Sequence, residues 1–209
     1  MTVHSSAQPE GLTVSAYTGG QLAEVLPHVA ELRIVVFRDW PYLYDGTLAY
    51  EQGYLARFAR AKDAVIVVAR DGVNVIGAAT AGPLMQHVPE FAGRFLAHGY
   101  DPERIFYCGE SVLLPAYRGR GLGHAFFDHR EAHARTCQSA NGAFTHTAFC
   151  GVVRPDADPA RPTAYRPLDA FWTKRGYTRI DGLVGSFSWT DIGDAGKTEK
   201  PMQFWTRAL

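Results

Sequence analysis

The segment from Glu110 to Arg135 constrains the fold more than any other part of this 209-residue chain. An apolar run ends at Pro115, a turn of sequence RGRGLG follows over 118–123, and from Leu122 the apolar residues recur at helical spacing. The first turn of a helix presents unpaired N–H groups and partial positive charge, and glycines let a ligand approach the backbone closely. The pattern therefore predicts a strand, a turn and a helix that bind a pyrophosphate or a similar polyanion.

Three other interpretations of this turn fit the sequence less well. A Walker A loop requires Lys-Ser or Lys-Thr after its glycines, and neither pair is present. A dinucleotide fingerprint requires GxGxxG in a βαβ unit, whereas this spacing is GxGxG in mid-chain, after an expected antiparallel meander. A solvated basic loop would account for Arg118 and Arg120. The position of the turn between a buried strand and an amphipathic helix favours the phosphate site instead.

Two motifs carry a resemblance to a known family. Arg118-x-x-Gly121-x-Gly123, preceded by LLPAY, resembles the acyl-CoA signature of the GNAT superfamily of N-acyltransferases, and FWTKRGY over 171–177 is similar to the FYxxxGF that ends the fourth helix of that family. The resemblance implies acetyl-CoA as the acyl donor substrate, with its pyrophosphate on the turn and its pantetheine arm along the preceding strand. The residues implied to bind it are Leu113, Leu114, Arg118, Gly119, Arg120, Gly121, Leu122, Gly123, His124 and Phe171.

The periodicity of the rest of the chain predicts an α+β fold. Strands are expected over 12–17, 64–69, 73–81, 105–114, 144–153, 183–191 and 200–207, and helices over 21–37, 48–61, about 90–97 and 168–175 besides the one that begins at Leu122. The Asp71-Gly72 pair between two apolar runs is a strong hairpin signal. The order β-α-α-β-β-β-α-β-α-β-β predicts a GNAT-like central mixed, mostly antiparallel sheet flanked by helices. Residues 1–11 are expected to form a flexible tail and 12–209 a single domain.

Composition excludes several classes of partner. Lys+Arg and Asp+Glu number 21 each, so the formal net charge is zero, which argues against a general binder of nucleic acid or anionic membranes. Neither a membrane-spanning apolar run nor a signal peptide is apparent. Cys108, Cys137 and Cys150 lack CxxC spacing and are expected to be free buried thiols in a reducing cytosol. The sequence thus predicts a cytoplasmic protein whose partners are acetyl-CoA and an unidentified amine acceptor, and it is compatible with a homodimer.

Acyl transfer from a thioester to an amine requires deprotonation of the amine, stabilisation of an oxyanion and departure of a thiolate. Glu110 is the candidate general base, since the resemblance implies an acidic residue near this position; a structural carboxylate paired with an arginine is the alternative. The general-acid tyrosine of the family corresponds to Trp172, which has no acidic proton. Tyr165 is the candidate substitute donor, and ordinary aromatic packing is its alternative.

Histidines and aromatic residues add further candidates. His129 and His133 have the i, i+4 spacing of metal ligands, but the residue after the first is not the Glu of a zincin, and we expect no metal. The resemblance implies that the aromatic-rich stretch over 37–58 contributes to an acceptor pocket, with Asp39 and Asp45 nearby to attract a cationic amine. A plain hydrophobic lid is the alternative for that stretch.

The sequence therefore predicts an N-acetyltransferase that moves acetyl from acetyl-CoA to a primary amine of a small molecule or protein by direct attack in a ternary complex. Trp172 and Tyr165 stand at two positions where the family has polar groups. They leave a catalytically impaired CoA-binding sensor or interaction domain as the alternative. A nucleotide-binding enzyme that uses the same turn is a third, weaker interpretation.

Overall fold

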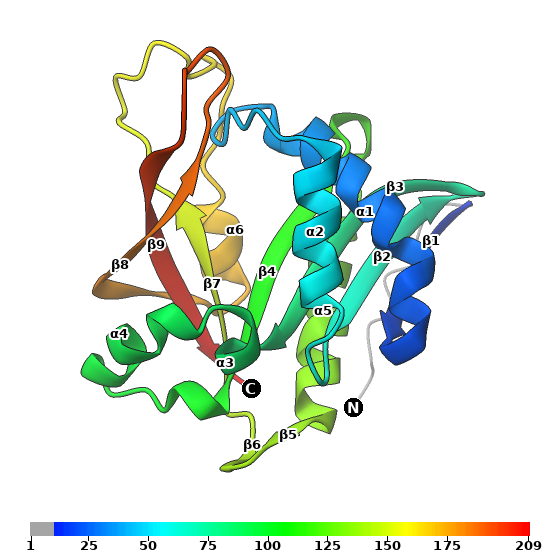
Figure 1. Ribbon diagram of the computed structural model, residues 1–209, viewed down its shortest axis with the longest axis vertical. Helices are drawn as coiled ribbons and strands as arrows, with labels where there is room; N and C mark the ends of the chain where they lie inside the picture. The colour runs from blue at the N-terminus through cyan, green and yellow to red at the C-terminus, as the bar shows by residue number, and fades with distance from the viewer. Residues whose placement is uncertain (1–10) are drawn as a thin grey trace.

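A single seven-stranded sheet forms the centre of the molecule, in the strand order β1-β2-β3-β4-β7-β9-β8 (Figure 1). The computed structural model describes residues 11–209, so nearly all of the expected tail over 1–11 lies outside the described residues. The strands are β1 (Leu12–Thr18), β2 (Val65–Asp71), β3 (Asn74–Pro83), β4 (Ile105–Leu113), β7 (His146–Val152), β8 (Thr178–Trp189) and β9 (Thr198–Ala208). Neighbouring strands are antiparallel except β4 and β7, which confirms the predicted mixed, mostly antiparallel sheet.

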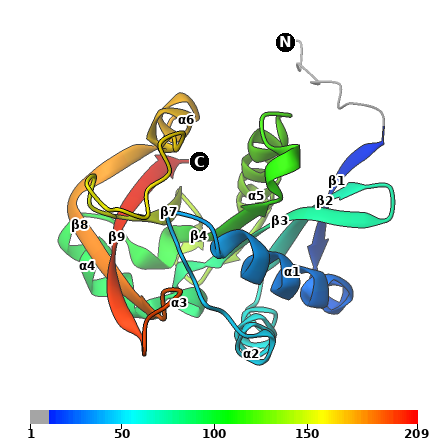
Figure 2. The same cartoon turned by 90° about the horizontal axis from the view of Figure 1, so that it is seen from above.

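Helices cover both faces of the sheet. In Figure 2, α1 (Leu22–Phe37) and α2 (Leu48–Phe58) lie on one face, and α5 (Leu122–Thr136) and α6 (Asp169–Lys174) lie on the other. The short helices α3 (Leu84–His87) and α4 (Ala92–Ala97) lie between β3 and β4 in the chain. Each face has its own buried apolar clusters, which is the α+β architecture predicted from element order. In the range 11–209 no helix is long and apolar enough to cross a membrane.

Several boundaries differ from the sequence-based expectation. β8 begins at Thr178 rather than 183, because its first residues pair with β9 before a register shift between Arg179 and Val184. That irregular stretch lacks the alternation that identifies a strand in sequence. The hairpin β5 (Gln138–Ser139) and β6 (Gly142–Ala143) was not expected. The hairpin around Gly72 is confirmed.

The two halves of the sheet join over a short distance. The parallel pairing of β4 with β7 is limited to Ile105–Tyr107 opposite His146–Ala148, and from Cys108 onward β4 pairs only with β3. Beyond this point the two strands diverge in Figure 1. The backbone of β4 next to β7 is therefore left without a strand partner in the middle of the sheet.

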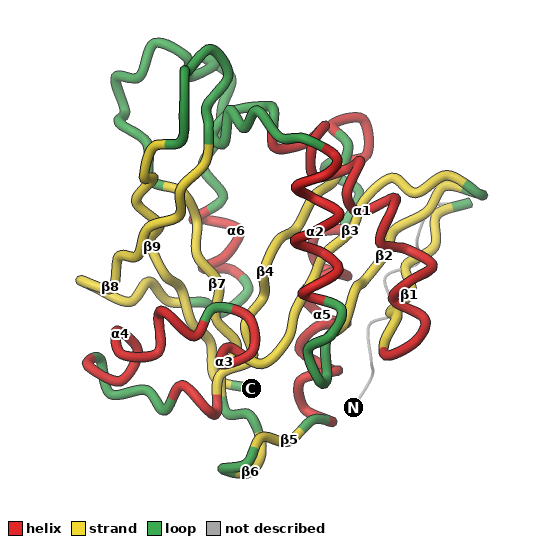
Figure 3. Tube along the Cα trace, viewed as in Figure 1, coloured by secondary structure: helices red, strands yellow, loops and turns green. Residues whose placement is uncertain are grey.

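Three loops meet at the end of the sheet toward which β4 and β7 diverge (Figure 3). These are 38–47, 153–168 and 190–197. Asp45 N–H donates to the carbonyl of Thr190 at 2.9 Å, and Ile192 N–H donates to the carbonyl of Leu43 at 2.7 Å. These contacts fix the aromatic stretch between α1 and α2 against β8.

Candidate functional site

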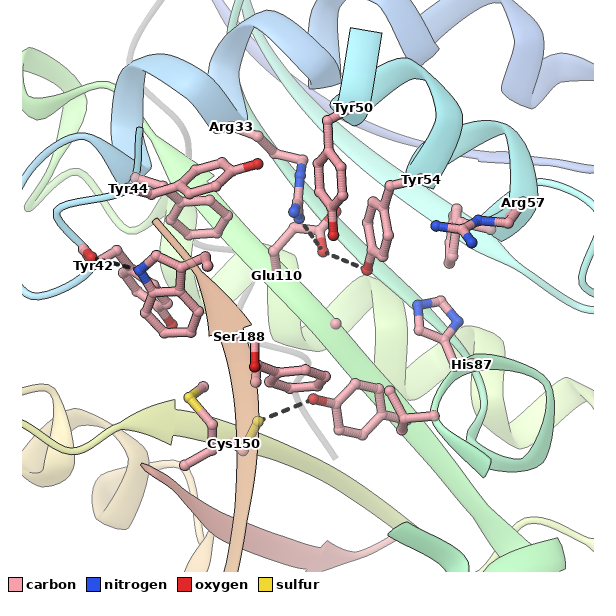
Figure 4. A pocket seen from close by; sticks show the side chains of 18 of the residues that line it. Arg33, Tyr42, Tyr44, Tyr50, Tyr54, Arg57, His87, Glu110, Cys150 and Ser188 are labelled. Atoms are coloured by element: carbon pink, nitrogen blue, oxygen red, sulfur yellow. Dashed lines mark hydrogen bonds and ion pairs between the residues drawn. The ribbon is translucent and has the colours of Figure 1, made fainter. Parts of the chain in front are cut away.

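A pocket of about 510 Å³ lies where α1, α2 and the 38–47 loop face β4, β7 and β8 (Figure 4). Its charged or titratable lining residues are Arg33, Arg57, His87, Glu90 and Glu110, besides tyrosines and Cys150. Aromatic side chains form the largest group in its wall: Phe37, Tyr42, Tyr44, Tyr50, Tyr54, Phe58, Tyr107, Phe187 and Trp189. Size, apolar walls and a few convergent polar groups are typical of a small-molecule site.

A β-bulge shapes the strand that carries Glu110. The register between β3 and β4 shifts between Ala79 and Ala81, so that Gly109 and Glu110 both lie opposite the single residue Thr80. A Cβ atom at Gly109 would lie 2.6 Å from Thr80 Oγ1, which requires glycine at this position. The same Thr80 Oγ1 accepts a hydrogen bond from Glu110 N–H at 3.3 Å.

The bulge decides which face of the sheet Glu110 occupies. Before it, Tyr107 packs in the cluster beneath α4, and after it Val112 packs in the cluster beneath α1 and α2. Cys108 belongs to the cluster on the opposite face. Regular alternation would place Tyr107 and Val112 on opposite faces, so the extra residue keeps both on one face. Glu110 shares that face and lines the pocket.

A buried arginine on α5 supports the bulge from the other side of the sheet. Arg130 is 1% exposed, and its Nη1 donates to the carbonyl of Glu110 at 3.1 Å and to that of Thr80 at 3.4 Å. Its Nε donates to the carbonyl of Phe126 at 3.2 Å. No carboxylate among residues 11–209 forms an ion pair with it. Within this range the guanidinium therefore binds backbone carbonyls only, and through the carbonyl of Glu110 it fixes the irregular part of β4.

Arg33 links two buried carboxylates at the pocket. Its Nη1 lies 2.7 Å from Glu110 Oε2, and its Nε donates to Glu51 Oε2. Glu51 is fully buried and also accepts from the hydroxyl of Tyr44 at 2.7 Å. The guanidinium lies over the ring of Tyr54, 4.5 Å from its centroid. Glu51 and Glu110 together raise the pKa of Arg33 against the opposing effect of burial, so Arg33 stays charged.

Glu110 retains capacity for a further donor. Its Oε2 accepts from Arg33 and, at 3.5 Å, from the hydroxyl of Tyr54, while its Oε1 has no hydrogen-bond partner among the described residues. Figure 4 shows Glu110 between Arg33 and Tyr54, near the middle of the pocket. A buried carboxylate with an unpaired oxygen is a group that can accept a proton or a hydrogen bond from a ligand.

Arg154 fixes the pocket wall formed by the 38–47 loop. Its guanidinium donates to the carbonyls of Pro41 and Tyr42, each at 2.8 Å, and to Asp191 at 2.7 and 3.1 Å. Trp189 Nε1 donates to the carbonyl of Tyr42 at 2.9 Å. Burial first, and then Cys150, raise the pKa of Tyr42, so its phenol stays protonated. The structure thus places a fixed phenol in the pocket wall.

His87 lies in the pocket without a polar partner. Neither ring nitrogen forms a hydrogen bond among the described residues, and the ring packs against Phe58 with centroids 4.6 Å apart. Burial, and secondarily Arg33, lower the pKa of His87 to about 4. The imidazole is therefore neutral at physiological pH.

This lowered pKa predicts a pH dependence of stability. The unfolded chain takes up a proton at His87 near pH 6.5, whereas the folded chain does so only near pH 4. Stability is therefore lost as pH falls from 6.5 to 4, by on the order of 3 kcal/mol. In urea unfolding across pH 4–7, His87→Gln should show a flatter profile than the unmodified protein. If the two profiles of unfolding free energy against pH run parallel, His87 does not contribute to the pH dependence of stability.

The glycine-rich turn leads into α5 as the sequence predicts. Gly121 has φ +82° and forms the N-cap of α5, and Gly119 has φ +77°. The N–H groups of residues 119–123 form no hydrogen bond with any described residue, and a Cβ at Gly119 or Gly121 would meet nothing within 4 Å. Successive unpaired amides before open space suit an anion. The turn therefore fits a pyrophosphate.

α6 packs directly against this turn. The ring of Phe171 lies 3.4 Å from where a Cβ of Gly123 would be, and 4.9 Å from the ring of His124 between centroids. Arg118 and Arg120 are exposed; Arg118 Nε donates to the carbonyl of Leu113 at 3.4 Å. Leu113 and Leu114 are half-buried at the end of β4. The structure thus brings the residues of the two motifs together at one end of the diverging strands.

Tyr165 and Trp172 lie outside the pocket lining. The ring of Tyr165 packs edge-on against Trp40, with centroids 6.0 Å apart. Trp172 covers Gly151, whose Cβ would lie 2.9 Å from the indole.

None of the remaining candidates lines the pocket except Cys150. His133 Nε2 is 2.9 Å from the carbonyl of Asp63, and Cys108, Cys137 and Cys150 are free and buried as predicted. Asp39 and Asp45 do not line the pocket, and Asp45 pairs with Arg38 at the surface.

The sequence reasoning missed the charged core of the site. Arg33 and Glu51 belong to helical patterns that predicted only amphipathic helices, and His87 lies in a region expected to be a loop. A charged residue on the apolar face of a helix is a weak signal for Arg33. Arg130 is the residue after His129 that departs from a zincin motif, and the sequence gives no sign that it supports β4. None of these could be placed beside Glu110 before the fold was known.

Comparison with known proteins identifies the family. The model of the acetyltransferase (GNAT) family matches residues 29–162, more than half of the chain. An acetyltransferase from Thermus thermophilus is 14% identical with a TM-score of 0.55, over 97% of this chain and 100% of that one. A putative acetyltransferase from Salmonella typhimurium, solved with acetyl-CoA, is 14% identical with a TM-score of 0.56, over 96% and 95%.

A GCN5-related N-acetyltransferase from Kribbella flavida is 19% identical, with a TM-score of 0.54 over 96% of this chain and 99% of that one. Comparison with curated protein sequences finds no match. At these identities the solved structures establish likeness of fold. The match of the family model, the glycine-rich turn before α5 and the diverging β4 and β7 agree, and the chain belongs to the acetyltransferase (GNAT) family.

Proposed function

We propose that this protein transfers acetyl from acetyl-CoA to a primary amine, with Glu110 as the general base. The observation that carries the proposal is the buried Glu110 carboxylate, which the bulge turns into the pocket on the face opposite α5. The strand that carries it continues to the turn at 118–123. Acceptor and donor would then approach the opening between β4 and β7 from opposite faces.

The turn would bind the donor. The N–H groups of 119–123 and the positive end of α5 would bind the pyrophosphate, with Arg118 and Arg120 adding charge. Leu113 and Leu114 would line the pantetheine arm, Leu122 would contribute its backbone N–H while its side chain stays in the core, and His124 and Phe171 would close the turn around the phosphates. Acetyl-CoA supplies an acyl group activated as a thioester. The Salmonella typhimurium structure with acetyl-CoA supports this donor.

Glu110 would take a proton from the ammonium, because an amine with a pKa near 10 is mostly protonated at neutral pH. The neutral nitrogen then attacks the carbonyl carbon, and the carbon–sulfur bond breaks. Backbone N–H groups of β4 that have no strand partner would stabilise the oxyanion. As the adduct collapses, the nitrogen loses its second proton, and the hydroxyl of Tyr42, in the pocket wall, would relay a proton to the departing thiolate so that the phenol ends protonated. Tyr165, whose ring packs on Trp40 outside the pocket lining, is the alternative donor predicted from sequence.

Titration calorimetry with acetyl-CoA and CoA tests the donor site, and detection of released thiol with a panel of primary amines tests turnover. We expect micromolar or tighter binding of both nucleotides and thiol release that depends on amine. Absence of binding by both would refute the proposal. Binding without amine-dependent release would instead support a CoA-binding sensor. Trp172 at the position of the general-acid tyrosine of the family is the observation that favours that second candidate.

Gly121→Val should weaken acetyl-CoA binding by at least about tenfold. Valine at φ +82° costs about 1–3 kcal/mol, and a turn that relaxes to avoid this strain no longer aligns its amides. Gly99→Val is a matched control, because Gly99 also has φ +82° and open space but lies after α4. Calorimetry should show normal acetyl-CoA affinity for the Gly99 variant. Equal affinities for the two folded variants would contradict the assigned binding turn.

A further inference from the structure

We propose that the acceptor is a small primary amine joined by a short alkyl chain to an aromatic ring, with no carboxylate beside the amino group. The proposal rests on the proposed function, since it names the substrate class of the same pocket. Three properties of the pocket carry it: its buried charge, its aromatic walls and its size.

The buried groups at the pocket carry one unbalanced negative charge. Arg33 is the one cation paired with both Glu51 and Glu110 among the described residues, and His87 is neutral. Arg130 lies on the opposite face of β4 and binds backbone carbonyls. A bound ammonium would neutralise this excess and give the unpaired Oε1 of Glu110 a donor.

A carboxylate next to the amine would reverse this balance. It would lie close to Glu51 and Glu110, whose shared cation, Arg33, already has both of them as partners. The other charged lining groups, Arg57 and Glu90, are exposed and opposite in sign, so together they leave the net charge of the pocket unchanged. Desolvating an additional anion here is costly, which disfavours α-amino acids.

Aromatic rings surround the position that the ammonium would take. Figure 4 shows Tyr44, Tyr50 and Tyr54 around the Arg33–Glu110 pair, with Tyr42 farther along the pocket. Ring faces stabilise cations and stack on flat apolar groups. Tyr50 is 46% exposed, so its ring can contact a ligand without repacking the core. A linear polyamine would leave most of this surface without a complementary partner.

The cavity volume of about 510 Å³ suits a molecule with one ring and a short side chain. The wall is formed by α1, α2 and β8 together, and the 38–47 loop is fixed by Arg154 and Trp189. A wall fixed by these hydrogen bonds favours a compact ligand over an extended peptide.

The test compares 2-phenylethylamine with L-phenylalanine, which adds only the carboxylate, with 1,4-diaminobutane, which lacks the ring, and with a peptide that has a free N-terminus. We expect kcat/KM for 2-phenylethylamine to exceed each of the others by at least about 30-fold, the ratio that about 2 kcal/mol of mismatched burial produces. Preference for any of the other three would overturn the proposal.

Saturation-transfer NMR on the protein without acetyl-CoA separates this inference from the proposed function. Binding of 2-phenylethylamine without any turnover would support the ligand class inferred for the pocket and reject the transferase. Turnover of 1,4-diaminobutane in preference to 2-phenylethylamine would keep the transferase and reject the inference.

A variant tests the aromatic wall itself. Tyr50→Leu should raise KM for 2-phenylethylamine about tenfold and KM for 1,4-diaminobutane by clearly less, because both amines lose a ring face near the ammonium but only 2-phenylethylamine also loses ring stacking. Tyr17→Leu is the matched control, since Tyr17 lies on the edge strand β1 and does not line the pocket. An equal change for both amines in the Tyr50 variant would contradict recognition of the ring.

Discussion

Glu110→Gln is expected to lower kcat/KM for the amine by about 10²–10⁴-fold at neutral pH, with acetyl-CoA affinity nearly unchanged. The amide has almost the same shape but cannot take the proton of the ammonium. The loss should shrink as pH rises, because the amine then arrives already neutral. Steady-state kinetics between pH 6.5 and 9.5, with calorimetry for acetyl-CoA, would measure both effects.

Glu51→Gln is the control for loss of the ion pair. It also removes a carboxylate from Arg33, yet Glu51 does not line the pocket. Its kcat/KM should stay within about tenfold of the unmodified protein, well short of a general-base contribution. Full activity of Glu110→Gln at pH 7 would assign Glu110 to structure and leave catalysis to positioning and backbone N–H groups.

Arg33→Met is expected to lower the free energy of unfolding by about 3–5 kcal/mol, the usual cost of leaving a buried charge without its partner. The side chain of Arg33 is 12% exposed, and those of its partners Glu51 and Glu110 are 0% and 4% exposed. Methionine fills similar space but leaves two carboxylates close together without a cation. Urea unfolding at pH 7 would measure the loss.

Arg161→Met is the surface control for this variant. Arg161 also pairs with an aspartate, Asp156, but that carboxylate is 98% exposed. The loss should be below about 1 kcal/mol. Equal losses of unfolding free energy in the two variants would show that burial does not strengthen the ion pairs of Arg33 with Glu51 and Glu110.

Local pattern was enough to predict the order of the main strands and helices, but not the short β5–β6 hairpin or α3. Apolar periodicity and the Asp71-Gly72 turn predicted the strands and helices, because these signals depend on neighbours within one element. The same holds for the turn at 118–123, in which Gly119 and Gly121 adopt positive φ values. The predicted boundary of β8 was wrong because Thr178 pairs with the distant strand β9, although the residues around it lack the alternation that identifies a strand in sequence.

The residues that line the pocket were predicted less well than the secondary structure. The aromatic residues between 37 and 58 predicted an acceptor site, and several of them do line the pocket. The expected carboxylates Asp39 and Asp45 do not line it; the carboxylates paired with Arg33 at the site are Glu51 and Glu110. Proximity in sequence was a poor guide here, because the loop turns its aspartates outward while α2 and β4 bring in residues from farther along the chain.

The sequence by itself determined the order of the main elements, the glycine-rich turn before α5 and the aromatic character of the pocket wall. Only the tertiary structure decided what Glu110 faces. Strand alternation without a bulge would place it on the α5 side, and the extra residue opposite Thr80 reverses this. The bulge depends on Gly109 packing against Thr80 and on Arg130 from a later helix. Contacts between residues distant in sequence carry no local periodicity, so the orientation of the candidate base emerges only when the sheet and α5 pack together.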